Sequence, residues 1–267
     1  MAQLTAGNSS SSRPSSKSDD DDDDSKEDKD DGGDHLGVAV AVYGDTVAAG
    51  APNHRNSAGV RVGAVCVVLG QKWTEVHTLS PADLSEDAYF GYSLAVQDSV
   101  MMVSAYDAAG DGLVFVYGRQ RGQLWAIRSI LRTSSALNGY FFGESLSVME
   151  YNLQGPSLAV GRNASTNDSS SSSSISKGSQ CAATTAVLAV GAPGAGEQAG
   201  AVYVFATLPY FSEPHCSAAA GEGSEVIAVD EASTAQLSGN DSRPFSAFGD
   251  SLCFGECVQV CVCVCVK

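Results

Sequence analysis

The residues with the clearest potential for covalent chemistry stand near the C-terminal end of the sequence, where Ser251 follows Gly249 and Asp250. A serine becomes a nucleophile only when a neighbouring base, normally a histidine oriented by an acid, takes its proton. Fifteen residues follow Leu252, and none of them is histidine. We therefore expect no catalytic role for Ser251.

The tetrapeptide at 249–252 also matches the Gly-Asp-Ser-Leu signature of a hydrolase family. In that family the serine block opens the domain and an Asp-x-x-His pair closes it, whereas here the block stands close to the end of the chain. The same position reads Gly-Tyr-Ser-Leu at 91–94 and Gly-Glu-Ser-Leu at 143–146. The three serines are therefore interpreted as structural residues that mark the register of a repeat.

Histidines and cysteines give no metal-binding or catalytic pattern. The four histidines, His35, His54, His77 and His215, are scattered and share no motif. Five of the eight cysteines crowd the C-terminus, at Cys253, Cys257, Cys261, Cys263 and Cys265. Zinc sites take cysteines in two separated pairs with short internal spacing, which this run does not match. We expect no catalytic, cofactor-binding or metal-binding residues in the chain.

A short phrase recurs along the chain and sets its organisation. Three copies are Phe90–Leu94, Phe142–Leu146 and Phe248–Leu252, and Leu36–Val40 is a degenerate fourth. Their glycines stand at 37, 91, 143 and 249, so the steps are 54, 52 and 106 residues. A period near fifty residues with several short strands in each unit is typical of propeller blades.

Each phrase is followed by the same order of apolar runs. The first run leads through a short turn into a second run that ends in small residues, such as Gly50–Pro52. A third run begins with glycine, as in Gly112–Tyr117 and Gly200–Phe205, and a fourth follows Trp73 or Trp125. Such runs are rich in Val, Ala, Tyr and Phe and are bounded by turn residues, which predicts strands. We therefore expect four antiparallel strands in each repeat.

The third copy offers two alternatives for its second strand. Leu158–Gly161 and Leu188–Gly191 both read Leu-Ala-Val-Gly. The Gly-Ala-Pro that completes the later run favours that run, whereas the spacing from the preceding phrase favours the earlier one. A polar, serine-rich stretch separates them, and we interpret residues near 163–180 as a disordered insertion. Glu225–Val229 is expected to supply the fourth strand of this copy.

These phrases resemble the FG-GAP repeat, which builds the β-propeller of integrin α subunits and of related extracellular proteins. The resemblance covers about residues 36–252 and is most specific in the third copy, where Phe142-Gly143, Gly191–Pro193 and Gly200–Phe205 all occur. It implies an all-β fold, a partial β-propeller of about three four-stranded antiparallel blades plus the first strand of a fourth. Since the family usually builds seven blades, we expect open blade faces through which the isolated chain self-associates.

The chain is expected to divide into three parts. Residues 1–34 form an acidic tail rich in Ser and Asp, a composition that predicts disorder. Residues 35–256 form the propeller, with blades at about 35–81, 89–132, 141–232 and 247–256. Residues 257–267 are interpreted as a low-complexity Cys-Val tail, because alternating Cys and Val is what a TG dinucleotide repeat encodes.

Many members of the family hold Ca²⁺ in an Asp-rich loop between the first and second strands of a blade. Ca²⁺ takes six to eight oxygen ligands, whereas this connection is only Tyr43–Asp45 in one copy and Gln97–Ser99 in the next. One acid in a short turn cannot build such a cage, and Asp107 and Asp111 stand in a different loop. We expect no calcium site.

Composition narrows the class of partner. The formal net charge is −16, which argues against nucleic acid because phosphate binding needs a basic patch. No secretory signal is visible at the N-terminus and no stretch has the length of a membrane span, although the resemblance implies an extracellular or cell-surface location. The sequence predicts a non-catalytic interaction, adhesion or recognition module whose blade loops meet a protein or a glycan. The alternative is a propeller portion that accompanies a hydrolase or other enzyme domain missing from this chain.

Overall fold

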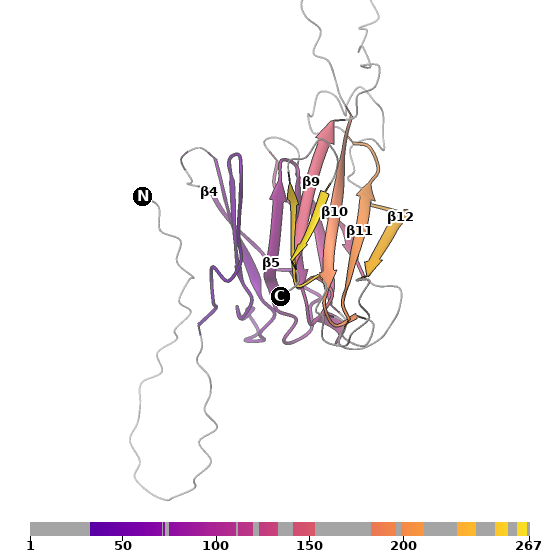
Figure 1. Cartoon of the computed structure of the whole chain (residues 1–267). Helices are drawn as coiled ribbons and strands as arrows, with labels where there is room; N and C mark the ends of the chain where they lie inside the picture. Colours follow the sequence, from indigo (N-terminus) through magenta and orange to yellow (C-terminus); the bar gives the residue numbers. More distant parts are fainter. Residues whose placement is uncertain are drawn as a thin grey trace, which may run out of the picture.

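The structure is a computed structural model, and it describes residues 33–70, 72, 75–110, 112–119, 123–132, 141–152, 183–195, 199–210, 229–238, 249–255 and 261–265. In these residues fourteen β-strands and one short 3-10 helix, Ala108–Gly110, make an all-β fold (Figure 1). None of the described helical segments has the length and apolar character that a membrane span requires. The predicted fold class is confirmed.

The strands form three four-stranded antiparallel sheets, each made of consecutive strands, and one two-stranded sheet. Blade 1 contains β1 (Val40–Tyr43), β2 (Thr46–Ala51), β3 (Ala64–Leu69) and β4 (Glu75–Leu79). Blade 2 contains β5 (Phe90–Gln97), β6 (Val100–Ala105), β7 (Leu113–Gly118) and β8 (Ala126–Leu131). Blade 3 contains β9 (Leu146–Asn152), β10 (Thr184–Ala192), β11 (Ala201–Thr207) and β12 (Val229–Ser238). The terminal sheet pairs β13 (Ser251–Gly255) with β14 (Cys261–Cys265).

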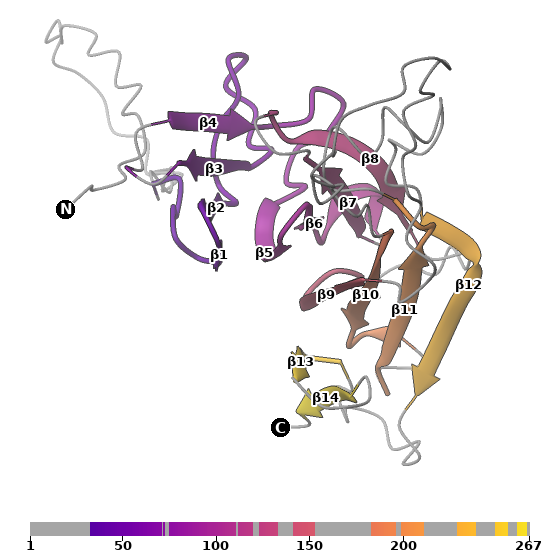
Figure 2. The ribbon, with the colours of Figure 1, turned by 90° about the horizontal axis from the view of Figure 1, so that it is seen from above.

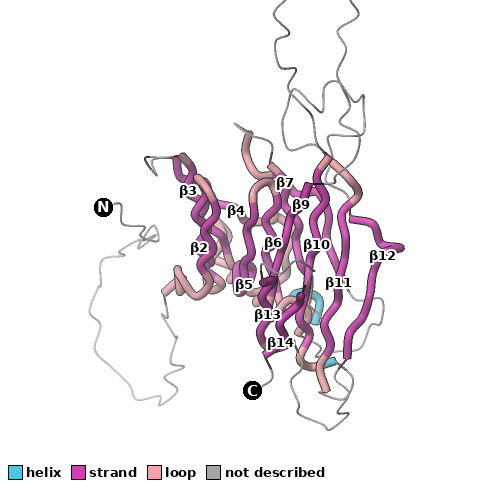
Figure 3. Tube along the Cα trace, turned by 45° about the horizontal axis from the view of Figure 1, so that its top comes forward, coloured by secondary structure: helices cyan, strands magenta, loops and turns pink. Residues whose placement is uncertain are grey.

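The four sheets fan around a common centre (Figure 2). The first strand of each sheet, β1, β5, β9 or β13, lies nearest this centre, and β4, β8 and β12 lie at the periphery. The strands of successive sheets run side by side along the fan (Figure 3). The fan does not close, and blade 1 and the terminal sheet border its open side. The arrangement is a partial propeller, as the repeat predicted.

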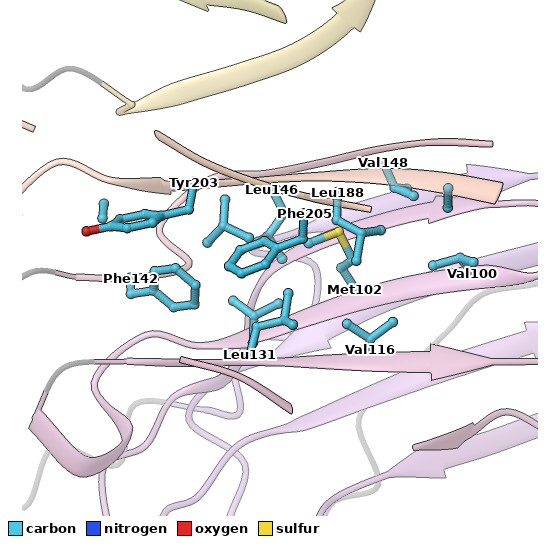
Figure 4. Close-up of a cluster of buried hydrophobic side chains, with 14 of the residues drawn as sticks. Val100, Met102, Val116, Leu131, Phe142, Leu146, Val148, Leu188, Tyr203 and Phe205 are labelled. Atoms are coloured by element: carbon cyan, nitrogen blue, oxygen red, sulfur yellow. The ribbon is translucent and has the colours of Figure 1, made fainter. Parts of the chain in front are cut away.

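Blade 2 is buried on both of its faces because apolar residues occupy alternate positions along its strands. Val103 pairs with Phe115 on the face that packs against blade 1. Met102 pairs with Val116 on the other face, which packs against blade 3. Figure 4 shows this second contact, in which side chains from β6, β7 and β8 meet those of blade 3.

The phenylalanine of the recurring phrase packs on aromatic residues of the third strand in its own blade. The Phe90 and Phe115 ring centroids are 5.4 Å apart, with an interplanar angle of 82°. Phe142 meets Tyr203 in the same way, at 5.5 Å and 70°. Edge-to-face contacts of this kind stabilise a core beyond the area that they bury. The repeated aromatic positions therefore build the face with which a blade meets the blade before it.

The glycines of the phrase lie where two blades touch through their backbones. Gly91 has a φ of 93° and faces Gly50 of blade 1, where an added Cβ would overlap the Gly91 carbonyl oxygen. Gly249 meets Gly191 of blade 3 in the same manner. Only glycine combines this positive φ with so close an approach. The two glycines of the motif are thus the two halves of one contact between successive blades.

Several expectations about strand positions need correction. The fourth strand of the third copy was expected at Glu225–Val229, but the described strand β12 begins at Val229 and runs to Ser238, and its pairing with β11 places Leu237 opposite Val202. Residues 225–228 lie outside the described residues. The terminal sheet has two strands rather than one, since residues 261–265 of the predicted low-complexity tail pair with β13, as alternating valines favour.

The structure also decides between the two alternatives for the second strand of blade 3. Leu188–Gly191 lies within β10, between β9 and β11. The competing run, Leu158–Gly161, lies outside the described residues, as do the serine-rich stretch and residues 1–32.

Candidate recognition surface at the Phe-Gly end

The loops that carry the recurring phrases converge at one end of the blades, which we call the Phe-Gly end. The connections that enter β5 and β9 lie there, together with the connection between β6 and β7. They bring four aromatic residues together, named here the aromatic cluster: Tyr89, Tyr92, Tyr106 and Phe141. The Tyr92 and Tyr106 ring centroids are 4.2 Å apart. The ring centroids of Tyr89 and Phe141 lie 5.4 and 6.0 Å from that of Tyr106.

Equivalent backbone turns position the members of this cluster. Tyr89 and Phe141 each precede the phenylalanine of a phrase, and their φ angles are 53° and 50°. Positive φ is uncommon for residues other than glycine, and it recurs where the surroundings hold the chain in place. In both copies a backbone N–H closes the turn: Tyr92 donates to the Tyr89 carbonyl, and Glu144 donates to the Phe141 carbonyl, each at 3.1 Å.

The aromatic cluster is only partly buried, unlike the aromatic residues between the blades. Phe142 is fully buried, whereas its neighbour Phe141 keeps 42% of its surface exposed. The three tyrosines are half-buried. Packing of the blades therefore does not account for the cluster, and exposed groups of aromatic residues are characteristic of interaction surfaces.

Two carboxylates lie beside the cluster because the repeat places them there. Tyr92, Glu144 and Asp250 each follow the glycine of a phrase, in three successive sheets. Burial raises the pKa of the Tyr92 phenol, and the carboxylates of Glu144 and Asp250 raise it further. Burial also raises the pKa of Glu144, with a contribution from Asp250. The Phe-Gly end thus combines aromatic faces with negative charge near the centre of the fan.

This combination suits a positively charged group better than an anion. A Lys ammonium or an Arg guanidinium is attracted to the faces of tyrosine and phenylalanine. Carboxylates supply the hydrogen-bond acceptors and the opposite charge for the same group. An anion would meet repulsion from both carboxylates.

The structure places the serines of the phrase in contacts between strands and blades. The Ser145 hydroxyl is buried and donates to the Gly249 carbonyl at 2.6 Å, which ties blade 3 to the terminal sheet. The Ser93 N–H donates to the Ser104 hydroxyl at 2.9 Å within blade 2. Ser251 is exposed on β13. None of these described contacts joins a serine to a histidine.

Two of the described histidines make side-chain hydrogen bonds with residues outside the aromatic cluster. His54 Nδ1 is 3.0 Å from Asp34 Oδ2, and His35 Nδ1 is 2.9 Å from the side-chain nitrogen of Asn53. His77 stands on the peripheral strand β4, and His215 lies outside the described residues. Among the described residues no three His, Cys, Asp or Glu side chains gather as a metal ion would require.

The opposite end of the blades, named here the hairpin end, carries a buried carboxyl group. Glu150 on β9 reaches the turn between β5 and β6, where the Ser99 N–H donates to Glu150 Oε1 at 3.0 Å. The Ser99 hydroxyl lies 3.2 and 3.3 Å from the two carboxyl oxygens. Burial raises the pKa of Glu150 to about 8, and the nearby Asp98 carboxylate adds to this shift.

An ion pair occupies the corresponding place between blades 1 and 2. Arg119 Nη2 lies 2.7 Å from Asp45 Oδ1, and its guanidinium carbon lies 5.2 Å from the centre of the Trp125 ring. The hydrogen bond to Arg119 is the main cause that lowers the pKa of Asp45. Trp125 is buried at this junction, which accounts for it by packing. Trp73 lies outside the described residues.

Comparison with known families identifies the repeat. The profile of the FG-GAP repeat family matches residues 73–117. Residues 73–117 are therefore similar to an FG-GAP repeat, as the motifs in this part of the sequence indicated. The matched segment contains β4, β5, β6 and all of β7 except Gly118, so one sequence repeat joins the outer strand of blade 1 to three strands of blade 2. A search of curated proteins gave no match.

The residues of the aromatic cluster were missed as a site by sequence reasoning. The signal that could have found them is the variation inside the phrase itself. The position after Phe-Gly reads Tyr, Glu and Asp in three copies, and the position before it reads Tyr89 and Phe141 in two. Variable aromatic and acidic residues that flank fixed ones are typical of a binding edge on a regular scaffold.

Proposed function

We propose that this chain is a non-catalytic recognition module that binds a protein partner at the Phe-Gly end. The observation that carries the proposal is the aromatic cluster, which is partly exposed and bordered by Glu144 and Asp250. A basic side chain of the partner enters between the tyrosine faces and these carboxylates. The FG-GAP match supports an interaction module, and the blades supply the rigid scaffold on which the loops stand.

The Phe-Gly end is preferred to the hairpin end because its aromatic faces remain exposed, whereas the charged groups of the hairpin end bind each other or the backbone. At the hairpin end Arg119 already pairs with Asp45, and Glu150 accepts hydrogen bonds from Ser99. At the Phe-Gly end the ring faces of Tyr92 and Tyr106 remain partly exposed. A cell-surface role in adhesion is the setting that the FG-GAP resemblance favours, and we include it in the proposal.

Peptide display on the purified chain tests the proposal. A random peptide library is selected on the wild type and, in parallel, on the Tyr92→Ala/Glu144→Gln variant. We expect peptides that contain Arg or Lys to be enriched on the wild type and at least tenfold fewer of them on the variant, since ring face and charge are both lost. Glu75→Gln, an exposed carboxylate on β4, serves as the control and should leave the enrichment unchanged.

Three outcomes would contradict the proposal. Enrichment of acidic or uncharged peptides would show that the surface does not select a cation. Equal enrichment on the wild type and the double variant would place binding away from the aromatic cluster. The third outcome comes from a glycan array run on the same two proteins, if sugars bind strongly and basic peptides do not.

A further inference from the structure

One carboxyl group joins blade 2 to blade 3 at the hairpin end. Glu150 stands on β9 of blade 3, and Ser99 lies in the turn between β5 and β6 of blade 2. The Ser99 N–H donates to Glu150 Oε1 at 3.0 Å, and the Ser99 hydroxyl lies 3.2 and 3.3 Å from the two carboxyl oxygens. The turn of one blade is therefore bound to a side chain of the next.

A buried tyrosine completes this contact. Tyr210 is 1% exposed, and its hydroxyl lies 3.4 Å from the Ser99 hydroxyl. The backbone of Tyr210 exchanges two hydrogen bonds with Thr184, the first residue of β10, at 2.7 and 2.8 Å. The segment that follows β11 is thus fixed to blade 3 beside Glu150. The contact has three parts: a turn of blade 2, a carboxyl group of β9 and a tyrosine beyond β11.

The groups around Glu150 favour its neutral, protonated form. Asp98, in the same turn as Ser99, places a second carboxylate nearby and raises the pKa of Glu150 after burial. Burial likewise raises the pKa of the Tyr43 and Tyr210 phenols, and Glu150 adds to both shifts. Among the described residues no Lys, Arg or His forms an ion pair with Glu150. Ionised Glu150 would lose hydration and meet a like charge without a compensating cation.

The basic residue that contacts this turn is bound elsewhere through its side chain. The Arg119 N–H donates to the Ser99 carbonyl at 2.9 Å. The Arg119 guanidinium belongs to the first junction, where Nη2 lies 2.7 Å from Asp45 Oδ1 and 3.1 Å from Thr46 Oγ1. The turn is therefore attached on one side by a backbone hydrogen bond and on the other by Glu150. Ionisation acts on the second attachment alone.

We propose that Glu150 is a proton-operated latch between blades 2 and 3. In its protonated form it holds the turn at Asp98 and Ser99 against β9 and Tyr210. When it loses its proton, the carboxylate moves into water and the turn separates from blade 3, while the apolar interior of the junction stays packed. The partly exposed position of Glu150 gives the side chain a short path to solvent.

Proton linkage sets the direction and the steepness of this response. Burial raises the pKa of Glu150 in the closed contact to about 8, whereas a hydrated glutamate has a value of about 4.3. Between these two values the closed state binds more protons than the open state. The open population should therefore rise by up to about tenfold for each pH unit in this window. It should level off above the pKa of the closed contact.

Native-state amide exchange of the full chain, measured by NMR, tests the proposal. The readout is the protection factor of the Ser99 amide, which is corrected for the intrinsic pH dependence of exchange. In the wild type we expect it to fall by up to about tenfold per pH unit. In Glu150→Gln, whose neutral amide keeps an oxygen acceptor, it should not change with pH. Glu75→Gln, an exposed carboxylate on β4, is the matched control and should follow the wild type.

An amide at the other end of blade 3 separates local opening from unfolding. The Gly191 N–H donates to the Ser145 carbonyl at 2.9 Å. At neutral pH its protection should exceed that of Ser99 by at least about tenfold. Low urea should speed the exchange of Gly191 and leave Ser99 nearly unchanged, because opening of one turn exposes little surface. Asp98→Asn is a second variant that keeps Glu150, and its Ser99 protection should level off at a lower pH.

Three results would overturn the proposal. A wild-type Ser99 protection factor that does not vary with pH would show that Glu150 ionises inside the closed contact. The same pH dependence in Glu150→Gln as in the wild type would assign the response to another group. A Ser99 amide that exchanges at the rate of Gly191, with the same urea dependence, would show that the contact opens only when the blade unfolds.

Discussion

The junction between blades 1 and 2 and the junction between blades 2 and 3 share a common interior but differ at the hairpin end. In both, a phrase phenylalanine is fully buried against aromatic residues of the third strand. In both, the glycine that opens the third strand of the earlier blade lies against this phenylalanine: an added Cβ at Gly63 would overlap the backbone of Phe90, and one at Gly112 the backbone of Phe142. The repeated residues thus build the same contact twice.

The hairpin ends of the two junctions use opposite electrostatics. The first holds the ion pair of Asp45 and Arg119, in which the Asp45 side chain is 50% exposed. The second holds Glu150, buried beside Asp98 and bonded to Ser99. Asp98 and Glu150 stand at the same distance from the phrase glycine, seven residues on. Both of these residues lie at the second junction, whereas Asp45 of the first junction stands eight residues after Gly37. The two junctions therefore hold different charged groups at the hairpin end and should respond differently to pH.

The largest expected effect concerns what the junctions share. Phe142→Ala should lower the free energy of unfolding by about 3–5 kcal/mol, since it empties a fully buried aromatic site. Phe90→Ala should cost a similar amount, because Phe90 is as deeply buried in the equivalent place. Urea denaturation at neutral pH measures both. Costs that differ by more than twofold would show that the two interiors are not equivalent.

The next largest effect is the cost of replacing a phrase glycine, which should differ between a closed junction and the open face of blade 1. Gly91→Ala should destabilise the chain by roughly 2–3 kcal/mol, because a positive φ is combined with backbone contact on the preceding blade. Gly37 has a similar φ, 98°, but open space around it, and Gly37→Ala should cost only about 1 kcal/mol. Denaturation at low protein concentration compares the two variants. Equal losses would mean that strain alone, and no contact between blades, requires glycine in the phrase.

Sequence reasoning predicted the shared interior because the residues that build it recur. The order of Phe-Gly, Gly-Ala-Pro and a glycine-led third run indicated three sheets, and each is present. The register of β12 was missed because its pairing with β11 is decided by distant residues. Strand β14 was missed because alternating Cys and Val was interpreted as simple sequence.

The candidate surface was harder to predict because it arises where loops of different repeats meet. Tyr106 joins Tyr92 and Phe141 only after two blades have packed. The burial of Glu150 likewise depends on β9, which continues to Asn152, whereas β5 ends at Gln97. Neither length could be read from the apolar pattern. Variable positions in a repeat carried the features that distinguish this chain, and their partners lie one blade away.

The pH response of the second junction should follow Glu150. Burial raises its pKa in the folded chain from the ordinary range of a glutamate to about 8, so the folded state holds a proton that the unfolded state releases. Stability from this group is complete below the unfolded value and is lost as pH rises through about 8. Glu150→Gln should remove this loss, with a relative gain on the order of 2 kcal/mol at alkaline pH.

Urea denaturation of the wild type and Glu150→Gln between mildly acidic and alkaline pH checks this expectation. Asp98→Asn is a second test, since removing the neighbouring carboxylate should lower the pKa of Glu150. The variant should then lose less stability than the wild type as the pH rises to neutral and above. Identical pH profiles for the wild type and Glu150→Gln would show that Glu150 is ionised without cost in the folded chain.

The smallest effect belongs to the ion pair of the first junction, and its sign is opposite. The pKa of Asp45 is lowered mainly by its hydrogen bond to Arg119. Its contribution is therefore present above the unfolded value and is lost as pH falls through the lowered folded value. Asp45→Asn should cost no more than about 0.5 kcal/mol at neutral pH, because half of the side chain is exposed and water screens the pair.

Three measurements distinguish this small effect from a packing change. High salt should reduce the cost of Asp45→Asn, since it screens an exposed charge pair. Strong acid should abolish the cost, because the wild-type carboxyl is then protonated as well. Arg119→Ala should cost more than Asp45→Asn, since the Arg119 side chain is only 11% exposed and also covers Trp125. If Asp45→Asn keeps its full cost in acid and in salt, the contrast between the junctions is one of packing rather than charge.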